Sequence, residues 1–298
     1  MNNRRLKDLV ASKLMLSTTI FSSLLAFAIA AALVQKSTLI LTTQPLNELL
    51  FSSSWHPWQG EFGFSPFIAG TLIVTAFSMV LSIPPSILMS IYLAEYAPSK
   101  IRGILKPLID LLAGIPSVIF GLWGVLLIVP LIRNYIAPFA GATTTGYSVL
   151  AGGIVLSIMV SPIIISISEE VIRAVPSHVR EASIALGATK WQTVKHAVAR
   201  SAFPGLVAAI MLGFGRAFGE TMAVLMVVGN VAKIPTSLFD PAYPLPALIA
   251  NNYGEMMSIP SYDSALMLAG LFLFLIVSVF SVGAALLLTR IKRRFALG

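Results

Sequence analysis

Apolar residues gather in six long blocks along the chain, separated by shorter polar segments. Each block has about the 20 residues that an α-helix needs to cross the hydrocarbon core of a membrane. The pattern therefore predicts an all-α, polytopic membrane protein. A short segment, residues 1–13, precedes a single transmembrane domain, residues 14–298. The six predicted transmembrane helices cover about 14–34, 67–93, 108–132, 147–167, 204–228 and 264–289.

The composition supports a membrane protein over a soluble one. Of the 298 residues, 57% are apolar and only 11% are charged, and the mean hydropathy is +0.89. A soluble protein of this size needs about twice that share of charge to cover its surface. The chain has no cysteine, which excludes a disulfide, a thiol nucleophile and a thiolate metal site.

The net charge of +8 is unevenly distributed. Sixteen of the 20 Lys and Arg residues fall on one side of the membrane if the N-terminus lies inside, and three fall on the other side. This bias predicts that both termini and the loop 168–203 are cytoplasmic. The basic charge is then a topology signal and predicts no nucleic-acid binding. The first block is longer than the roughly 7–15-residue core of a signal peptide, which favours a retained helix.

The loop 168–203 contains the most specific pattern, EASIALG at Glu181–Gly187. Ser177 follows Pro176 and is a good N-cap type, and Gly187 suits the left-handed end of a helix. Thr189 and Gln192 then have the spacing of a capping box. We expect a helix, a glycine turn and a second helix. The loop is either an ordinary connection or, as we favour, a docking element for a partner protein.

The predicted spans contain irregular features. Proline interrupts the second span at Pro84 and Pro85 and the third at Pro116. Backbone groups freed by proline must be satisfied by neighbouring helices or by a water-filled path. In the fifth span, Gly215 and Gly219 have the G-x-x-x-G spacing that lets another helix approach closely. Tight packing without any pathway is the alternative for these glycines.

The fifth span also contains the charges deepest in the membrane. Arg216 lies roughly 18 Å along a helix that begins at Pro204, and Glu220 follows one turn later, where it could form an intrahelical pair. A charge at this depth costs on the order of 3 kcal/mol or more. One interpretation is a structural ion pair. The other is a charged point on a translocation path, where the arginine fork suits an oxyanion such as phosphate.

Known catalytic patterns are missing from the sequence. It contains no H-E-x-x-H, no G-x-S-x-G and no G-x-x-x-x-G-K-[ST], and His56, His178 and His196 are scattered. We therefore expect no catalytic residues, no metal site and no cofactor bound by this chain. Any energy from ATP must come through a partner.

Three segments resemble a known family. EASIALG is similar to the E-A-A, three residues, Gly motif of ABC-importer permeases. GRAFGETMAV (Gly215 to Val224) and AGIPSVIFGLWG (Ala113 to Gly124) resemble the PstC-type permease of phosphate importers. The resemblance extends from about Phe67 to the end. Two departures stand out: Ser183 replaces the second Ala, and residues 197–200 read AVAR where the family has Ile-x-Leu-Pro.

The resemblance implies the type I ABC-importer permease fold and ATP-driven import of inorganic phosphate by alternating access. It implies three partners: a homologous PstA-type permease, a PstB-type ATPase dimer that binds ATP and Mg, and a PstS-type phosphate-binding protein docked on the outer segments 35–66 and 230–263. The implied path residues are Arg216, Glu220 and Thr221, and the implied ATPase-coupling residues are Glu181, Ala182, Ser183 and Gly187.

Other functions stay open at the level of sequence. The substrate could be another oxyanion, such as phosphonate, sulfate or molybdate. An ATP-independent secondary transporter or channel is a less favoured alternative, because we see no internal repeat. An intramembrane lipid enzyme would need a nucleophile or metal constellation that the sequence does not show.

Overall fold

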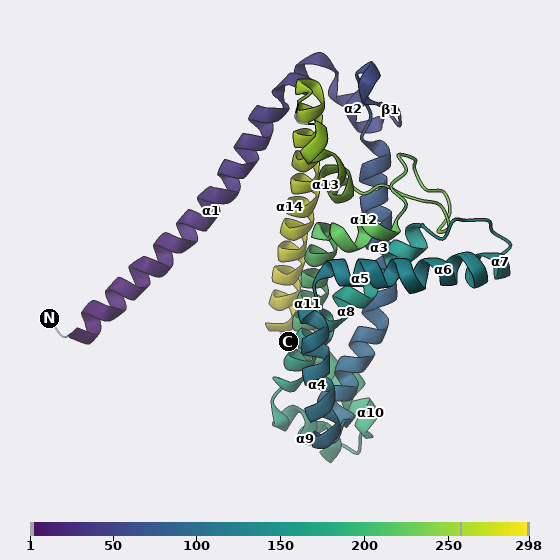
Figure 1. Cartoon of the computed structure of the whole chain (residues 1–298). Helices are drawn as coiled ribbons and strands as arrows, with labels where there is room; N and C mark the ends of the chain where they lie inside the picture. The colour runs from purple at the N-terminus through teal and green to yellow at the C-terminus, as the bar shows by residue number, and fades with distance from the viewer. Residues whose placement is uncertain (1–2, 257, 297–298) are drawn as a thin grey trace.

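The protein is an elongated bundle of helices with a small outer cap and one helix that leans away from the body (Figure 1). The computed structural model describes residues 3–256 and 258–296. In chain order the helices are α1 (Asn3–Thr43), α2 (Leu46–Phe51), α3 (Ser65–Ile91), α4 (Ser99–Gly114), α5 (Ser117–Trp123), α6 (Val129–Leu131), α7 (Ala137–Phe139), α8 (Val149–Arg173), α9 (Ser177–Ala185), α10 (Lys190–Thr193), α11 (Ala199–Gly219), α12 (Met222–Val227), α13 (Leu245–Met256) and α14 (Pro260–Ala296).

Short π-helical turns join several of these helices into longer rods. They are η2 (Tyr92–Tyr96), η3 (Gly124–Ile128), η4 (Ile132–Ile136) and η5 (Val194–Val198). The described residues thus contain six helical rods long and apolar enough to cross a membrane, which confirms the all-α architecture with six candidate spans. The rods cover Asp8–Thr43, Ser65–Tyr96, Ser117–Phe139, Val149–Arg173, Lys190–Gly219 and Pro260–Ile291.

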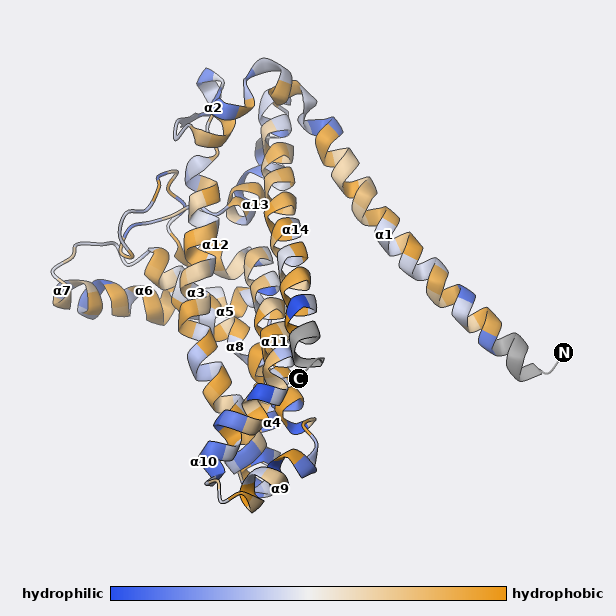
Figure 2. Cartoon of the chain, turned by 180° about the vertical axis from the view of Figure 1, so that it is seen from behind, coloured by the Kyte–Doolittle hydropathy of each residue, from blue (hydrophilic) through white to orange (hydrophobic). Residues whose placement is uncertain are grey.

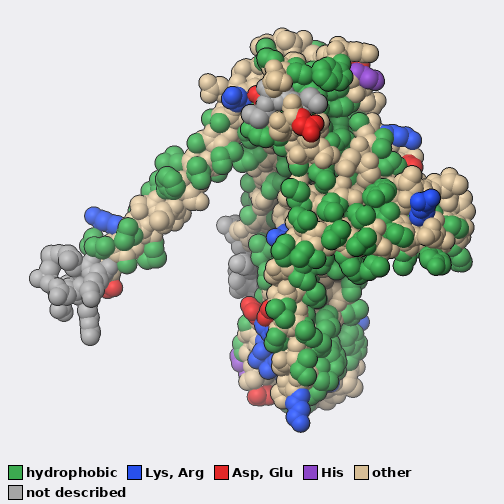
Figure 3. All heavy atoms as spheres, viewed as in Figure 1, with side chains coloured by type: hydrophobic (Ala, Val, Ile, Leu, Met, Phe, Trp, Pro, Cys, Tyr) green, Lys and Arg blue, Asp and Glu red, His purple; other side chains and the backbone are tan. Residues whose placement is uncertain are grey.

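Polar residues concentrate at one end of the bundle. In Figure 2, the hydrophilic colours gather on α9, α10 and the adjoining part of α4, whereas α1 and α14 are mainly apolar. Figure 3 shows the molecular surface, where apolar side chains cover much of the body and several Lys and Arg lie at its lower tip. We call this tip, residues 177–198, the α9–α10 end.

The centre of the bundle is the contact between α3 and α8. The inward side of α3 has buried hydroxyl side chains at three- and four-residue spacing. On α8, Gly152 and Gly153 have no side chain and so let α3 approach closely. Ser82 and Ser161 share a hydrogen bond of 3.0 Å across this contact. Small and hydroxyl residues allow membrane helices to pack closely. The buried hydroxyls of α3 are Thr71, Thr75, Ser78, Ser82, Ser86 and Ser90.

The predicted third span, 108–132, is wrong in its limits. Helix α4 ends at Gly114, Ile115 is extended, and a new helix begins at Ser117. Pro116 explains the break, because proline disfavours the helical conformation in the residue before it. The spanning rod is therefore Ser117–Phe139. By contrast, Pro84 and Pro85 lie inside α3 without ending it, so the predicted interruption there is wrong.

The predicted fifth span, 204–228, is also wrong in its limits. The rod begins at Lys190 and runs through Pro204, so residues 197–200, which depart from the family pattern, are helical. It ends at Gly219, because Glu220 adopts an extended conformation, with φ −75° and ψ 124°. Helix α12 then takes a new direction and packs on α5 (Figure 1).

Helix α4 is attached to α8 by charged side chains. Lys106 Nζ lies 2.8 Å from Glu169 Oε2, and Arg173 Nη1 lies 3.3 Å from Glu169 Oε1. Only 2% of the Glu169 side chain is exposed, so a partner is required to offset its desolvation. Burying this carboxylate between two cations fixes the orientation of α4.

Helix α1 touches the body only near its C-terminal part. Ser37 and Ile40 are buried there, the Ile40 amide donates to Ser264 Oγ, and Ser264 Oγ donates to the Lys36 carbonyl. The apolar part before residue 30 is exposed along its length and leans away from α14 (Figure 1). A helix that is apolar on all sides must be covered by lipid or by another protein.

An aromatic cap closes the opposite end of the bundle from α9. The two short strands β1 (Trp55–His56) and β2 (Glu61–Phe62) form an antiparallel hairpin around the turn η1 (Pro57–Gln59). Trp55 contacts four aromatic rings at centroid distances of 4.7–6.0 Å: Phe62, Phe64, Phe67 and Tyr262. The cap thus joins the start of α3 to the start of α14.

The close packing of Gly124 against α8 and α12 is testable by substitution. A Cβ at this position would lie 2.7 Å from both Val155 Cγ2 and Val227 Cγ1, in the buried core. We expect Gly124→Ala to lower the free energy of unfolding by about 1–3 kcal/mol, because β-branched neighbours cannot move aside. Thermal unfolding of the purified protein in detergent measures this. Gly283→Ala is the matched control, since a Cβ there meets nothing within 4 Å; equal effects of the two variants would contradict the prediction.

Candidate functional site

The loop at the α9–α10 end has the predicted helix–turn–helix form. Gly187 has φ +82°. In the capping box, the Thr189 side chain accepts from the Gln192 amide and the Gln192 side chain accepts from the Thr189 amide. Both predictions are confirmed. The prediction for Ser177 is wrong: Pro176 occupies the N-cap position, and Ser177 is the first helical residue without a capping bond.

Three large apolar side chains of this loop are exposed among the polar residues of its surface. Leu186 is 89% exposed, and Ile184 and Trp191 are more than half exposed. The predicted coupling residues Glu181, Ala182 and Gly187 are exposed, while Ser183 is half-buried and shares a hydrogen bond of 3.0 Å with Thr193. Exposed apolar side chains on a small, capped loop are typical of a protein interface.

Arg216 lies in the last turn of α11, with its side chain exposed. Among the described residues, no hydrogen bond or ion pair involves its guanidinium. Gly215 and Gly219 are exposed beside it, and a Cβ at either would meet nothing within 4 Å. The three residues thus form one open face of α11, which we call the Arg216 face.

The predicted one-turn pair of Arg216 and Glu220 is wrong. Because the helix ends at Gly219, Glu220 leaves the Arg216 face and its Oε1 accepts a hydrogen bond of 3.2 Å from the Ala223 amide. Glu220 instead lines a small internal cavity with Thr71 and Thr75 of α3. A carboxylate at this position caps the Ala223 amide, which has no helical partner in the first turn of α12.

Thr221, the third predicted path residue, follows the break. Its Oγ1 lies 3.4 Å from the Gly219 carbonyl oxygen, a weak hydrogen bond. The structure therefore brings Arg216, Gly215 and Gly219 together and separates Glu220 from them. The sequence analysis missed this division, although a Gly before two polar residues was a signal for the end of a helix.

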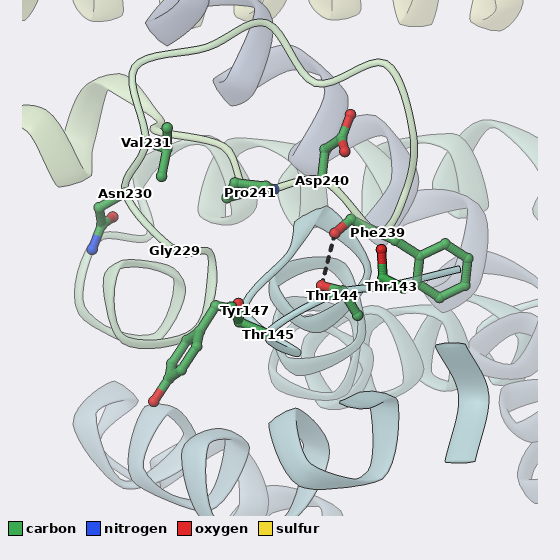
Figure 4. A pocket seen from close by; sticks show the side chains of 10 residues that line it. All are labelled: Thr143, Thr144, Thr145, Tyr147, Gly229, Asn230, Val231, Phe239, Asp240 and Pro241. Carbon is green, nitrogen blue, oxygen red and sulfur yellow. Dashed lines mark hydrogen bonds between the residues drawn. The ribbon is translucent and has the colours of Figure 1, made fainter. Parts of the chain in front are cut away.

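A separate cavity of about 670 Å³ lies between the loop after α7 and the loop after α12 (Figure 4). Three consecutive threonines, Thr143, Thr144 and Thr145, line one side, and the Thr144 hydroxyl donates to the Phe239 carbonyl at 3.0 Å. Asp240 and Asn230 line the other side. The sequence analysis did not identify this cavity, because it depends on two loops far apart in the chain.

Asp240 stabilises the turn at residues 236–240, which forms part of the cavity wall. Its Oδ2 accepts from the Thr236 amide and hydroxyl, both at 2.9 Å, and from the Ser237 amide at 3.0 Å. These bonds favour the ionised carboxylate, with the Thr236 backbone bond the largest cause, and lower the pKa of Asp240 below its ordinary value.

No metal centre is evident in the described part of the chain, where no three His, Asp or Glu residues converge. His56, His178 and His196 are all exposed. His56 pairs with Glu61 at 3.2 Å in the outer hairpin.

Comparison with known proteins identifies the family. Residues 86–296 match the family described as "Binding-protein-dependent transport system inner membrane component". The chain belongs to this family. The resemblance of EASIALG to the permeases of such systems is thereby confirmed.

Individual relatives show which members of the family the chain is similar to. The permease is 37% identical to the "Phosphate transport system permease protein PstC" of Xylella fastidiosa (strain 9a5c), over 82% of this chain and 79% of that one. It is 35% identical to the protein of the same name from Pasteurella multocida, over 97% and 95%. It is 42% identical to the "Probable ABC transporter permease protein YqgH" of Bacillus subtilis, over 70% and 66%. The likeness to PstC-type permeases is confirmed.

Solved structures share the fold. A chain of a bacterial alginate ABC transporter, in complex with a pentasaccharide-bound periplasmic protein, matches with a TM-score of 0.65 and 16% identity, covering 93% of each chain. A chain of the MetNI methionine ABC transporter matches with a TM-score of 0.55 and 21% identity, covering 77% of this chain and 94% of that one. The permease therefore has the ABC-importer fold, as the sequence motifs implied.

The capping role of Glu220 is testable by two substitutions. Glu220→Ala removes the acceptor for the Ala223 amide, and we expect it to lower the free energy of unfolding by about 1 kcal/mol. Glu220→Gln keeps an oxygen that can accept the same bond and should unfold near the wild-type temperature. The exposed Glu255→Ala serves as the control. Equal destabilisation by Gln and Ala would show that charge, not capping, stabilises the break.

The Asp240 turn should be sensitive to acid. Because its folded pKa is depressed, its stabilisation is complete above the ordinary value of 3.8 and is lost as the pH falls below it. Hydrogen exchange of the Thr236 and Ser237 amides, compared between about pH 6 and pH 3, should show protection factors that fall with acid. Asp240→Asn should remove this dependence. Protection factors in the wild type that do not change with pH would contradict the prediction.

Proposed function

We propose that the permease is a transmembrane subunit of an ATP-driven importer of inorganic phosphate and forms half of its translocation path. The observation that carries the proposal is the open Arg216 face on a transmembrane rod. An arginine in an apolar span is costly unless it faces water, a charged ligand or a partner. Its planar fork can donate two hydrogen bonds to one phosphate oxyanion. The names of the PstC relatives support phosphate as the substrate.

The other wall of the path would come from a homologous, PstA-type permease. Two features of this chain support a second permease. Gly215 and Gly219 leave room for a close helix approach beside Arg216. The exposed apolar length of α1 provides a second surface that a neighbouring transmembrane domain or lipid could cover.

The α9–α10 end would dock into a PstB-type ATPase dimer. Leu186, Ile184 and Trp191 offer the apolar contact, and Gly187 fixes the turn that presents them. ATP and Mg would bind to that partner, and this chain would hold no cofactor and hydrolyse nothing. Movement of the ATPases would tilt the attached helices and open the path at the inner or the outer side in alternation.

The outer surface would receive a PstS-type phosphate-binding protein. Trp58 and Phe51 are 80% and 81% exposed on the cap formed by residues 46–64. The distribution of Lys and Arg supports an inner-membrane location with both termini in the cytoplasm. Residues 14–298 would form the single permease domain, and 168–203 its coupling loop.

Uptake of radiolabelled phosphate into proteoliposomes tests the proposal. The complete transporter would be assembled with its presumed permease, ATPase and binding-protein partners. We expect Arg216→Gln to lower the uptake rate at least about tenfold while ATPase remains bound, because one charge-assisted contact of about 1.4 kcal/mol or more is lost. Gly187→Ala should release the ATPase, since alanine is strained at φ +82°.

Arg133→Gln is the matched control, because Arg133 is also exposed but lies outside the Arg216 face. Unchanged uptake in Arg216→Gln would remove Arg216 from the path. Uptake that proceeds without ATP or partners would favour a secondary transporter. Stronger competition by unlabelled sulfate, molybdate or a phosphonate than by phosphate would reassign the substrate.

A further inference from the structure

One arginine joins three separate segments where the membrane rods meet the α9–α10 end. The guanidinium of Arg180, in the first half of α9, donates to Glu95 Oε1 through Nη2 at 2.7 Å and through Nε at 3.0 Å. The same Nη2 donates to the Ile172 carbonyl at 2.9 Å, and Nη1 donates to the Val175 carbonyl. Arg180 thus connects α9 with the end of the α3 rod and with the end of α8.

The chemistry of this site requires arginine. Ile172 lies in the last turn of α8 and Val175 just after it, where carbonyl groups have no i+4 helical amide and the helix dipole favours a cation. One planar guanidinium can satisfy these carbonyls and a carboxylate together, whereas a lysine ammonium lacks this fork. The Glu95 side chain is 10% exposed and that of Arg180 is 23% exposed, so water screens the contact only in part.

Helix α9 has few other attachments. None of its nine residues, all of them described, is fully buried. Val179 is half-buried against the core, and Ser183 reaches Thr193. On its C-terminal side, a Cβ at Gly187 would meet nothing within 4 Å. The Arg180 contacts are therefore the main polar link between α9 and the α3 and α8 rods.

The α3 rod extends from this link to the outer cap. Glu95 lies in the π-helical turn η2 that continues α3, and α3 remains one helix back to Ser65. Along the way, Thr71 and Thr75 border the cavity that contains Glu220, at the break after the Arg216 face. A displacement of α9 that is passed to Glu95 would thus reach the wall beside the helix break.

We propose that Arg180 and Glu95 are positioning residues that form a rigid strut, which transmits movement of the docked α9 to the α3 rod. The inference rests on the proposed function, because it presumes an ATPase on the α9–α10 end. The strut stays closed through the transport cycle. It contributes to coupling between ATP hydrolysis and transport, and it does not form the docking surface itself.

The test uses the complete transporter in proteoliposomes and measures ATP hydrolysed per phosphate taken up. In Arg180→Lys and in Glu95→Ala, we expect the ATPase to remain bound and ATP hydrolysis to continue. The ratio of ATP to phosphate should rise at least about fivefold, as for the loss of a coupling energy of about 1 kcal/mol or more. A role in folding alone would lower hydrolysis and uptake together and leave the ratio unchanged.

Arg173→Lys is the matched control. Arg173 is also an arginine near the end of α8, but its bond to Glu169 stays within one helix. It should therefore leave the ratio at the wild-type value. A similar rise of the ratio in Arg173→Lys would overturn the assignment of coupling to the Arg180 link.

A cross-link distinguishes a strut from a switch that opens in each cycle. The chain has no cysteine, so Glu95→Cys with Arg180→Cys provides the single cysteine pair within it. Unlinked, this double variant should be uncoupled; joined by a short bismaleimide, it should regain most of the wild-type ratio. A cross-link that abolishes uptake by the otherwise coupled complex would overturn the rigid strut.

ATPase binding and ATP-independent uptake give the remaining tests of the proposal. Loss of ATPase binding in Arg180→Lys would assign the arginine to docking and overturn the proposal. A wild-type ratio in both single variants would overturn it as well, while leaving the proposed function intact. Wild-type vesicles that take up phosphate without ATP would instead reject the proposed function, and the strut with it.

Discussion

The need to satisfy every backbone amide and carbonyl within an apolar medium governs this structure. Continuous helices meet that need, so each place where a rod is interrupted must supply other partners. Glu220 does so after Gly219, where its carboxylate accepts the Ala223 amide at the start of α12. After the break at Ile115 and Pro116, α5 begins at Ser117, and α5 and α12 pack together. The helices that follow the two interruptions thus pack against each other, and Gly124 lies close to Val227 in the same region.

The cost of burying an unpaired polar group also separates the charged side chains into two kinds, those that are buried and paired and one that is exposed. Glu169 is buried and accepts bonds from Lys106 and Arg173, and Glu95 is nearly buried against Arg180. These charges hold α4, α8, α9 and the α3 rod in fixed relation at one end of the bundle. Arg216 differs from them, because it is exposed on a spanning rod and no described side chain pairs with it. That difference separates groups that stabilise the permease from a group available to a ligand or a partner.

Sequence reasoning succeeded where a local pattern was sufficient. The left-handed Gly187 and the Thr189–Gln192 box follow from backbone preferences over a few residues, and both are present. It failed where a choice depended on distant contacts. The pairing of Arg216 with Glu220 assumed a continuous helix, but Glu220 instead turns toward Thr71 and Thr75 on α3. The link between Arg180 and Glu95, 85 positions apart, carries no periodic signal at all.

By itself, the sequence determined that the chain is an all-helical membrane protein with six spans, and its motifs indicated the permease family. These properties follow from hydrophobic length and local turn chemistry, which depend little on neighbours. The tertiary structure decided where the rods break, which faces stay open and which charges meet. Those features depend on packing between segments far apart in the chain, because a helix ends or a charge is buried only where a neighbour satisfies the groups involved.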